Sequence, residues 1–203
     1  MPTTTTTTMP SASARMMLRL NSADRLDMVT DGAVRLIREL GPEGLTIRRM
    51  AAASDMSPGW LMDRFGSKDR LLSLMAATLG ARWWTWVDRR AHRDGLLAPL
   101  PTEDDEVEGM QVWLTFVELG RLHDGVGERT AVVRRDERAL VAALLRQGPE
   151  HYPSADEVTA ILALVDGLRQ ALCAPQEAIA PDDARRILHL HLPQLSQLPQ
   201  LGQ

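Results

Sequence analysis

The stretch from Leu45 to Leu72, LTIRRMAAASDMSPGWLMDRFGSKDRLL, constrains the fold more than any other part of this chain. Apolar residues recur there at helical spacing in two short runs, which are separated by a break at 54–57. Thr46 and Ser57 come directly before the runs, where a side-chain oxygen can accept a hydrogen bond from an otherwise unpaired amide. Pro58 then occupies a first helical position, where its missing N–H costs nothing. We therefore expect two short helices joined by a tight turn.

Two short helices joined in this way form the helix-turn-helix plan, in which the second helix lies in the DNA major groove. Leu61 and Phe65 are four residues apart in the second helix, so both are expected to face the core. This spacing leaves the other bulky side chains of the helix facing outward, namely Trp60, Met62, Asp63 and Arg64. The pattern predicts a surface that can enter DNA.

Over about 50 residues, a set of positions keeps a fixed spacing across three predicted helices: Gly41, Gly44, Thr46, Ile47, Ala51, Ser57, Gly59, Leu61, Phe65, Ser67, Lys68, Leu71 and Leu72. This spacing resembles that of the TetR family of transcriptional regulators. The chain departs from the family pattern at Met62, where a tyrosine that grips a phosphate is usual, and at Trp60, where a small residue is usual. Asp63 adds a carboxylate, which repels phosphate but can accept a hydrogen bond from cytosine N4.

The resemblance implies a ligand-responsive, sequence-specific DNA-binding regulator, and repression is the family's common habit. The residues expected at the DNA are Thr46, Arg48, Ser57, Gly59, Trp60, Met62, Asp63, Arg64 and Lys68. We assign Arg48 and Lys68 to phosphates, and the outward residues of the second helix to base edges or nearby sugars. Because Met62 and Asp63 depart from the pattern, the alternative is a helical small-molecule-binding protein of the same fold with weakened or lost DNA binding.

The charge of the chain is unevenly distributed. The net charge of the 203 residues is -4, yet residues 15–70 hold 10 lysines and arginines against 8 aspartates and glutamates. The basic excess therefore coincides with the predicted DNA-binding part, as expected for a protein that meets phosphates. Arg15 and Arg19 precede the first helix and either contact the DNA minor groove or backbone, or belong to a solvated tail.

No segment alternates apolar and polar residues for long, so an all-helical fold is expected. Residues 21–66 are predicted to form a three-helix DNA-binding head, and 67–193 a helical ligand-binding and dimerisation body. Residues 1–20 are interpreted as a disordered low-complexity arm and 194–203 as a loose tail. The helices expected in the body cover about 67–91, 103–122, 128–147, 154–172 and 181–192, with His123, Asp124 and Gly125 closing the second of them.

The C-terminal part resembles, more weakly, that of the choline-responsive repressors within the same family. Two features carry this resemblance, the run Val165-Asp166-Gly167-Leu168 and the helix start at Pro181-Asp182-Asp183-Ala184.

Aromatic residues concentrate in two helices of the predicted body. The residues expected to line a ligand cavity there are Trp83, Trp86, Met110, Trp113, Phe116 and Glu118. Such a cavity suits a small apolar or cationic molecule, because a ring face or the Glu118 carboxylate can meet a positive charge. The alternative for each tryptophan taken singly is that it packs in the core.

One reading head covers only half of a site, so a homodimer on a palindromic stretch of double-stranded DNA is expected. The last two helices carry broad apolar stripes, and they are the predicted interface. The residues assigned to it are Leu164, Gly167, Leu168, Ala171 and Leu188. The alternative is that these stripes pack only within one chain.

Other classes of protein find little support in the sequence. The five histidines are scattered, and we find neither a nucleophile motif nor a glycine-rich phosphate loop, so no enzyme and no cofactor is expected. The single Cys173 argues against a cysteine-based metal site. No apolar run approaches the about 18 residues that span a membrane, and the start lacks the pattern of a secretory signal. A cytoplasmic location follows as an expectation.

Overall fold

The computed structural model describes residues 22–146 and 152–192, and within these ranges it is all-helical, as the sequence predicts. The α-helices are α2 (Ser22–Leu40), α3 (Ile47–Ala53), α4 (Pro58–Phe65), α5 (Lys68–Asp94), α6 (Asp104–Leu119), α7 (Asp124–Leu144), α8 (Ala155–Leu172) and α9 (Pro181–His191), with short 3-10 turns η1 (Pro42–Gly44) and η2 (Gly95–Leu97). Within the described ranges, no helix combines the length and apolar character needed to cross a membrane. The expected arm and tail, including Arg15 and Arg19, lie outside the described residues.

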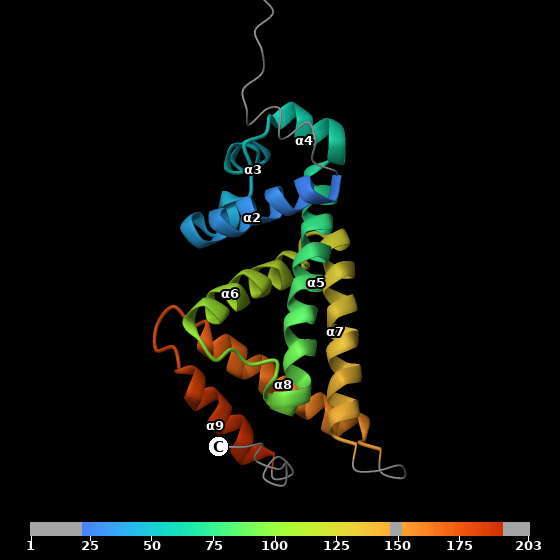
Figure 1. Ribbon diagram of the computed structural model, residues 1–203, viewed down its shortest axis with the longest axis vertical. Helices are drawn as coiled ribbons and strands as arrows, with labels where there is room; N and C mark the ends of the chain where they lie inside the picture. The colour runs from blue at the N-terminus through green and yellow to red at the C-terminus, as the bar shows by residue number, and fades with distance from the viewer. Residues whose placement is uncertain (1–21, 147–151, 193–203) are drawn as a thin grey trace, which may run out of the picture.

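Helices α2, α3 and α4 form the head at one end of the molecule (Figure 1). The predicted N-caps are present: the Thr46 hydroxyl accepts from the amide of Arg49, and the Ser57 hydroxyl accepts from the amide of Trp60. Asp55 has a φ of 57° in the turn between α3 and α4. Each capping bond pairs an amide that the helix itself leaves unsatisfied, so the polar sequence around the turn fixes where both short helices begin.

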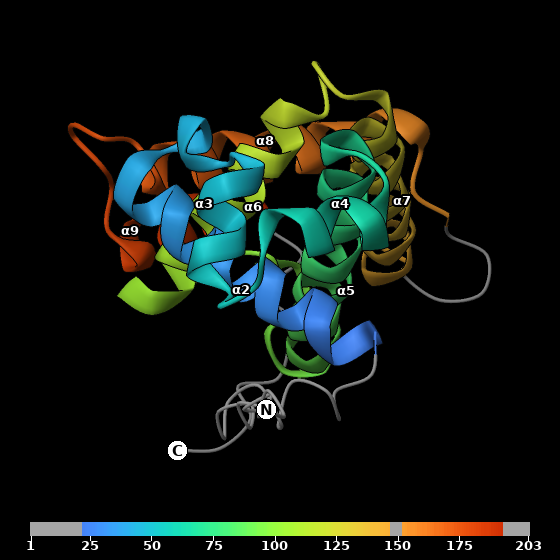
Figure 2. The same ribbon diagram turned by 90° about the horizontal axis from the view of Figure 1, so that it is seen from above.

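Helix α5 runs from the head down the length of the body, with α7 beside it (Figures 1 and 2). Its 27 residues correspond to about 40 Å at 1.5 Å per residue. Ser67 caps its first turn, and the backbone turns sharply just before it at Gly66, whose φ of 81° suits glycine. A helix of this length gives the head and the body one shared element.

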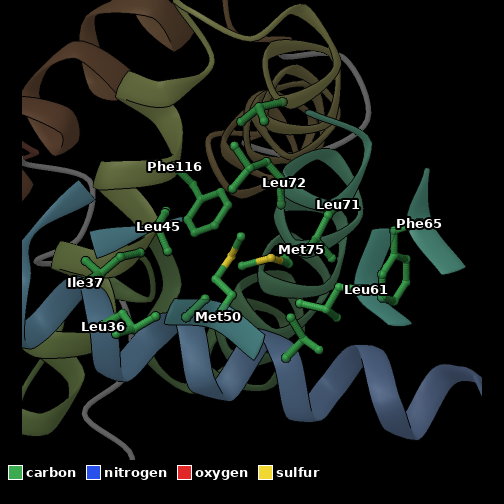
Figure 3. Packing of buried hydrophobic residues seen from close by; sticks show 14 of the residues in the cluster. Leu36, Ile37, Leu45, Met50, Leu61, Phe65, Leu71, Leu72, Met75 and Phe116 are labelled. Carbon is green, nitrogen blue, oxygen red and sulfur yellow. The ribbon is translucent and has the colours of Figure 1, made fainter. Parts of the chain in front are cut away.

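The head and the body also share one hydrophobic cluster (Figure 3). Met50 of α3, Leu61 of α4 and Met75 of α5 are fully buried in it, and Phe116 of α6 enters the same cluster from the body. The head therefore does not end sharply at residue 66 in its packing, because side chains from α5, α6 and α7 complete its core.

Two further clusters fill the body. One joins α8, α9 and the η2 region, and it buries Leu162, Leu168 and Leu188. The other lies between α5, α6 and α7 around Trp83 and Trp113. Helices α8 and α9 lie at the end of the molecule opposite the head (Figure 1).

The sequence placed the boundary between α6 and α7 wrongly. His123 and Asp124 do not close α6, which ends at Leu119; Asp124 instead begins α7. An aspartate in a first turn is favoured by the partial positive charge of the helix N-terminus, and Val126, two residues later in that turn, is fully buried. The two helices approach so closely here that a Cβ on Gly127 would lie 2.7 Å from the Gly120 carbonyl oxygen.

Candidate nucleic-acid interface and ligand cavities

Helix α4 divides into a buried side and an exposed side. Leu61 is fully buried and Phe65 is 6% exposed, which holds the helix on the head. Met62, Asp63 and Arg64 are exposed on its other side. Their outward position agrees with the sequence interpretation, and their role at DNA stays a prediction.

Trp60 does not face fully outward as the sequence predicted. Its side chain is half-buried, lies edge-on to Phe65 at 6.0 Å between ring centroids, and has the Arg25 guanidinium 4.9 Å from its ring centre. Packing the large indole ring of Trp60 against the core removes apolar area from water, and this favours the half-buried position over full exposure. Trp60 therefore supports the position of α4 at least as much as it adds to the exposed surface.

The remaining residues predicted at the DNA lie around α4. Arg48 and Lys68 are exposed at the starts of α3 and α5, the helices before and after α4 in the chain. Gly59 is exposed too, and a Cβ placed on it would meet no atom within 4 Å, so the backbone there is open to close approach. The Thr46 and Ser57 hydroxyls are exposed while they cap their helices.

Four of the six residues predicted to bind a ligand surround one cavity of about 310 Å³, which we call the tryptophan cavity. They are Trp83, Trp86, Met110 and Trp113. Two carboxylates that the sequence analysis did not assign also line it, Asp105 and Glu106 at the start of α6. Their position follows from the acidic first turn of that helix, which is readable in the sequence.

The ring faces in the tryptophan cavity are largely occupied by the protein itself. The Arg169 guanidinium lies 5.0 Å from the Trp83 ring centre, and Arg90 lies 4.4 Å from that of Trp86. Trp83 and Trp86 also contact each other, with ring centroids 4.8 Å apart. Glu106 is paired with Arg90 at 3.0 Å and also accepts hydrogen bonds from Trp86 and Thr102. A ligand cation would therefore find its charge partner in Asp105 rather than in Glu106 or in these ring faces.

Phe116 and Glu118 do not belong to this cavity. Phe116 is fully buried in the cluster that completes the head, because its position on α6 points it toward α3 and α5. Glu118 is exposed, pairs with Arg121 at 3.2 Å, and lines two other cavities of about 430 Å³ and 910 Å³. The helical period of α6 separates it from Trp113 by more than one turn, which the sequence analysis overlooked.

A buried ion pair lies next to Trp83. Arg169 Nη2 donates to Glu137 Oε1 at 2.6 Å, and Trp83 Nε1 donates to the same oxygen at 3.0 Å. Burial by itself would raise the pKa of Glu137, but the charge and hydrogen bonds of Arg169, together with the Trp83 N–H, hold that pKa below its ordinary value. This pair could not be predicted from the sequence, because two charged residues 32 positions apart carry no local pattern.

Exposed ion pairs join the head to the body. Arg82 of α5 contacts Asp27 and Asp31 of α2 at 2.8 and 2.5 Å, and it also lines the tryptophan cavity. Arg38 at the end of α2 contacts Glu108 of α6 at 3.1 Å. These contacts place charged groups of the head within reach of the cavities.

The predicted dimer residues fall into two groups. Leu168 and Leu188 are buried in the cluster between α8 and α9, so within this chain they are not open to a partner, and that part of the assignment is corrected. Gly167 is exposed, and a Cβ placed on it would meet no atom within 4 Å; Leu164 and Ala171 are half-buried. Ala160 and Ala163 are exposed on the same side of α8 but were not among the predicted residues, although their helical spacing from Gly167 is visible in the sequence.

Metal binding finds no support in the part of the chain that the structure describes. No group of three or more histidine, cysteine, aspartate or glutamate side chains there could hold a metal ion.

Two family models match the sequence. The N-terminal model of bacterial regulatory proteins of the TetR family matches residues 29–75, which include the helix-turn-helix. A model described as the C-terminal part of BetI-type transcriptional repressors matches residues 88–197, more than half of the chain.

Individual proteins are also similar to this chain in sequence or in structure. An HTH-type transcriptional regulator, PksA, of Bacillus subtilis (strain 168) is 25% identical over 196 residues, which cover 87% of this chain and 92% of the relative. A transcriptional regulator from Rhodococcus sp. Rha1 superimposes with a TM-score of 0.72 at 20% identity, covering 87% of this chain and 97% of that one. A regulator from Saccharomonospora viridis, solved in complex with choline, superimposes with a TM-score of 0.68 at 19% identity, covering 85% of this chain and 97% of that one. At these identities the two structural likenesses show the fold.

Proposed function

This chain belongs to the TetR family of transcriptional regulators, with a C-terminal part of the BetI type, and we propose that it is a repressor released from its operator by a small apolar or cationic molecule. The family models and relatives describe DNA-binding regulators rather than enzymes. The repression and the effector are our inference.

The observation that carries the proposal is the exposed side of α4. The helix is capped by Ser57, anchored by two buried side chains, and presents Met62, Asp63 and Arg64 to solvent at the end of the molecule away from α8 and α9. A short, rigid helix with bulky polar residues outward can enter a major groove. The exposed side chains of Arg48 in α3 and Lys68 in α5 are our candidates for holding the phosphates that flank the groove.

A dimer would supply the second reading head. We propose that α8 packs against its counterpart through the exposed small residues Ala160, Ala163 and Gly167, which allow two helix backbones to approach closely. Leu190 of α9 is 66% exposed, and it would be covered in the same contact. Symmetric heads require a palindromic operator, because each head then meets the same half-site.

The tryptophan cavity is the proposed effector site. It brings Trp113 and Met110 together with the carboxylate of Asp105, a combination that suits a small cation with apolar substituents. The choline-bound structural neighbour belongs to the same fold and supports this class of ligand. Arg82 connects this cavity to α2, so a cation bound beside it would oppose the ion pairs that hold the head.

The mechanism is a shift between two populations of the dimer. A ligand changes operator affinity only to the extent that it prefers the form in which the heads are out of register. Helix α5 starts beside α4 and passes the tryptophan cavity, so it is the element that can transmit this preference.

The alternative function is a small-molecule-binding protein of this fold with weak DNA binding. The observation that favours it is the exposed Asp63 carboxylate on α4, because a negative charge on the reading side repels phosphates.

Filter binding to the DNA that flanks the protein's own gene tests the proposal. Sequence-specific retention at moderate salt supports it, and retention equal to that of unrelated DNA supports the alternative. Arg48→Gln and Lys68→Gln should each weaken binding to every sequence and reduce the salt slope by about one unit. Arg129→Gln, on the exposed surface of α7, is the matched control and should change neither quantity.

A further inference from the structure

The largest of the cavities described above lies where the head meets the body. This junction cavity has a volume of about 910 Å³, within the range of about 300–1,000 Å³ found for small-molecule sites. Ile37 and Arg38 of α2 line it from the head, Leu114 and Glu118 of α6 form another wall, and Cys173 follows the end of α8. Among the described residues, its lining shares no member with that of the tryptophan cavity.

The lining of the junction cavity is mostly apolar, with a few charged groups. Leucine, isoleucine, valine and proline side chains make up much of the wall, and Leu122 beside it is 79% exposed. The charged members among the described residues are Arg38, Arg121 and Glu118, so guanidinium groups outnumber carboxylates. A planar guanidinium matches a carboxylate through two parallel hydrogen bonds.

Both arginines are held in exposed ion pairs, and a ligand carboxylate can replace their present partners. Arg38 pairs with Glu108, and the two side chains are 43% and 55% exposed. Arg121 pairs with Glu118, and these side chains are 78% and 57% exposed. Ion pairs this exposed contribute about 0–1 kcal/mol, so a ligand carboxylate that also buries an apolar chain can displace them.

We propose that the junction cavity is a second ligand site, which takes an elongated apolar molecule with one carboxylate held by Arg38 and Arg121. The apolar part of the ligand lies along Ile37, Leu114 and Leu122, where it removes exposed apolar surface from water.

Such a ligand contacts the head directly. When its carboxylate takes Arg38 from Glu108, the end of α2 loses its charged contact with α6. The bound ligand then lies between α2 and α6, and the position of α2 relative to α6 sets the orientation of the head and of α4 within it. This last step rests on the function proposed above, whereas occupation of the cavity does not.

Cys173 provides the test, because it is the single cysteine of the chain and lines the junction cavity. Burial raises the pKa of its thiol to about 11, so alkylation is slow and its rate can be followed by mass spectrometry. The probe is dodecanoate, used below its micelle-forming concentration on the full chain. At about ten times its Kd, a ligand that covers the thiol should slow alkylation about tenfold by mass action.

Variants and matched probes test the chemistry of the site. Arg38→Gln and Arg121→Gln should each weaken protection by dodecanoate about tenfold, the loss expected for one charge-assisted hydrogen bond, while Arg129→Gln leaves it unchanged. Dodecanol and dodecyltrimethylammonium should protect less than dodecanoate. No protection of Cys173 by dodecanoate overturns the site, and equal protection by the cationic probe overturns the assignment of the carboxylate.

Operator binding is measured separately, so that the two proposals can fail independently. Saturating dodecanoate should lower operator affinity by about fivefold or more, and Arg38→Gln should remove this effect. Protection of Cys173 with unchanged operator affinity keeps the ligand site and overturns its coupling to the head. Protection in a chain that retains no DNA specifically contradicts only the function proposed above.

Discussion

Replacing Glu137 with glutamine isolates the contribution of the buried ion pair to stability. Glu137 is 4% exposed and Arg169 is 3% exposed, so the substitution leaves a guanidinium in the core without its nearest counter-charge. The carboxylate of Asp166 remains in contact with it at 3.3 Å. Breaking a buried pair in this way costs about 3–5 kcal/mol, and the remaining contact of Arg169 with Asp166 favours the lower part of this range. For a chain of this size, each kcal/mol of lost unfolding free energy lowers Tm by about 2–4 °C, so the Tm of Glu137→Gln should fall by about 6–20 °C.

Thermal unfolding followed by far-UV circular dichroism measures this decrease, at one fixed protein concentration because the proposed dimer would add to stability. Glu118→Gln is the matched control, since it removes the same charge from an exposed pair and should cost at most about 1 kcal/mol. Arg169→Met combined with Glu137→Gln should be less destabilised than the sum of the two single changes, because it leaves no unpaired charge. A Glu137→Gln chain as stable as the wild type would refute the reasoning.

Three further predictions concern packing, capping and pH. Gly127→Ala should lower Tm by several degrees in differential scanning calorimetry, because its Cβ would meet the Gly120 carbonyl oxygen, whereas Gly109→Ala, whose Cβ meets nothing within 4 Å, should not. Ser57→Ala should cost about 1 kcal/mol in urea unfolding, through loss of the cap on α4; an unchanged midpoint would contradict this. The pKa of Glu137 is lower in the folded chain than in the unfolded chain. The stabilisation that its carboxylate gives to the folded state is therefore complete above about pH 4.3 and is lost as the pH falls through the folded pKa. Tm should therefore fall more steeply with acid in the wild type than in Glu137→Gln, and parallel curves would disprove the assignment.

Local chemistry made much of the head predictable. The caps at Thr46 and Ser57, the proline at the start of α4 and the core positions Leu61 and Phe65 all follow from contacts within a few residues. Such contacts depend on sequence spacing alone, so a reading of the chain can find them. Trp60 shows the limit, because its half-buried position depends on Arg25 of another helix.

Contacts between distant segments were harder to predict. The aromatic residues were assigned to a cavity by composition, and the structure divides them, since Trp83, Trp86 and Trp113 surround one cavity while Phe116 completes the head. Which face of α6 meets which neighbour depends on the crossing of three helices, and a helical period does not specify this. The same holds for Leu188, which the sequence placed on an apolar stripe without showing what covers that stripe.

The central claim is that the exposed side of α4 reads base edges. Selection of bound sequences from a random pool, carried out with the wild type and with Arg64→Gln, tests it most directly. We expect both proteins to enrich palindromes with the same half-site spacing, one or more whole helical turns between centres, but with a different preferred base at one position in each half-site. Enrichment of no palindrome by the wild type, or of the identical sequence by both proteins, would contradict the account.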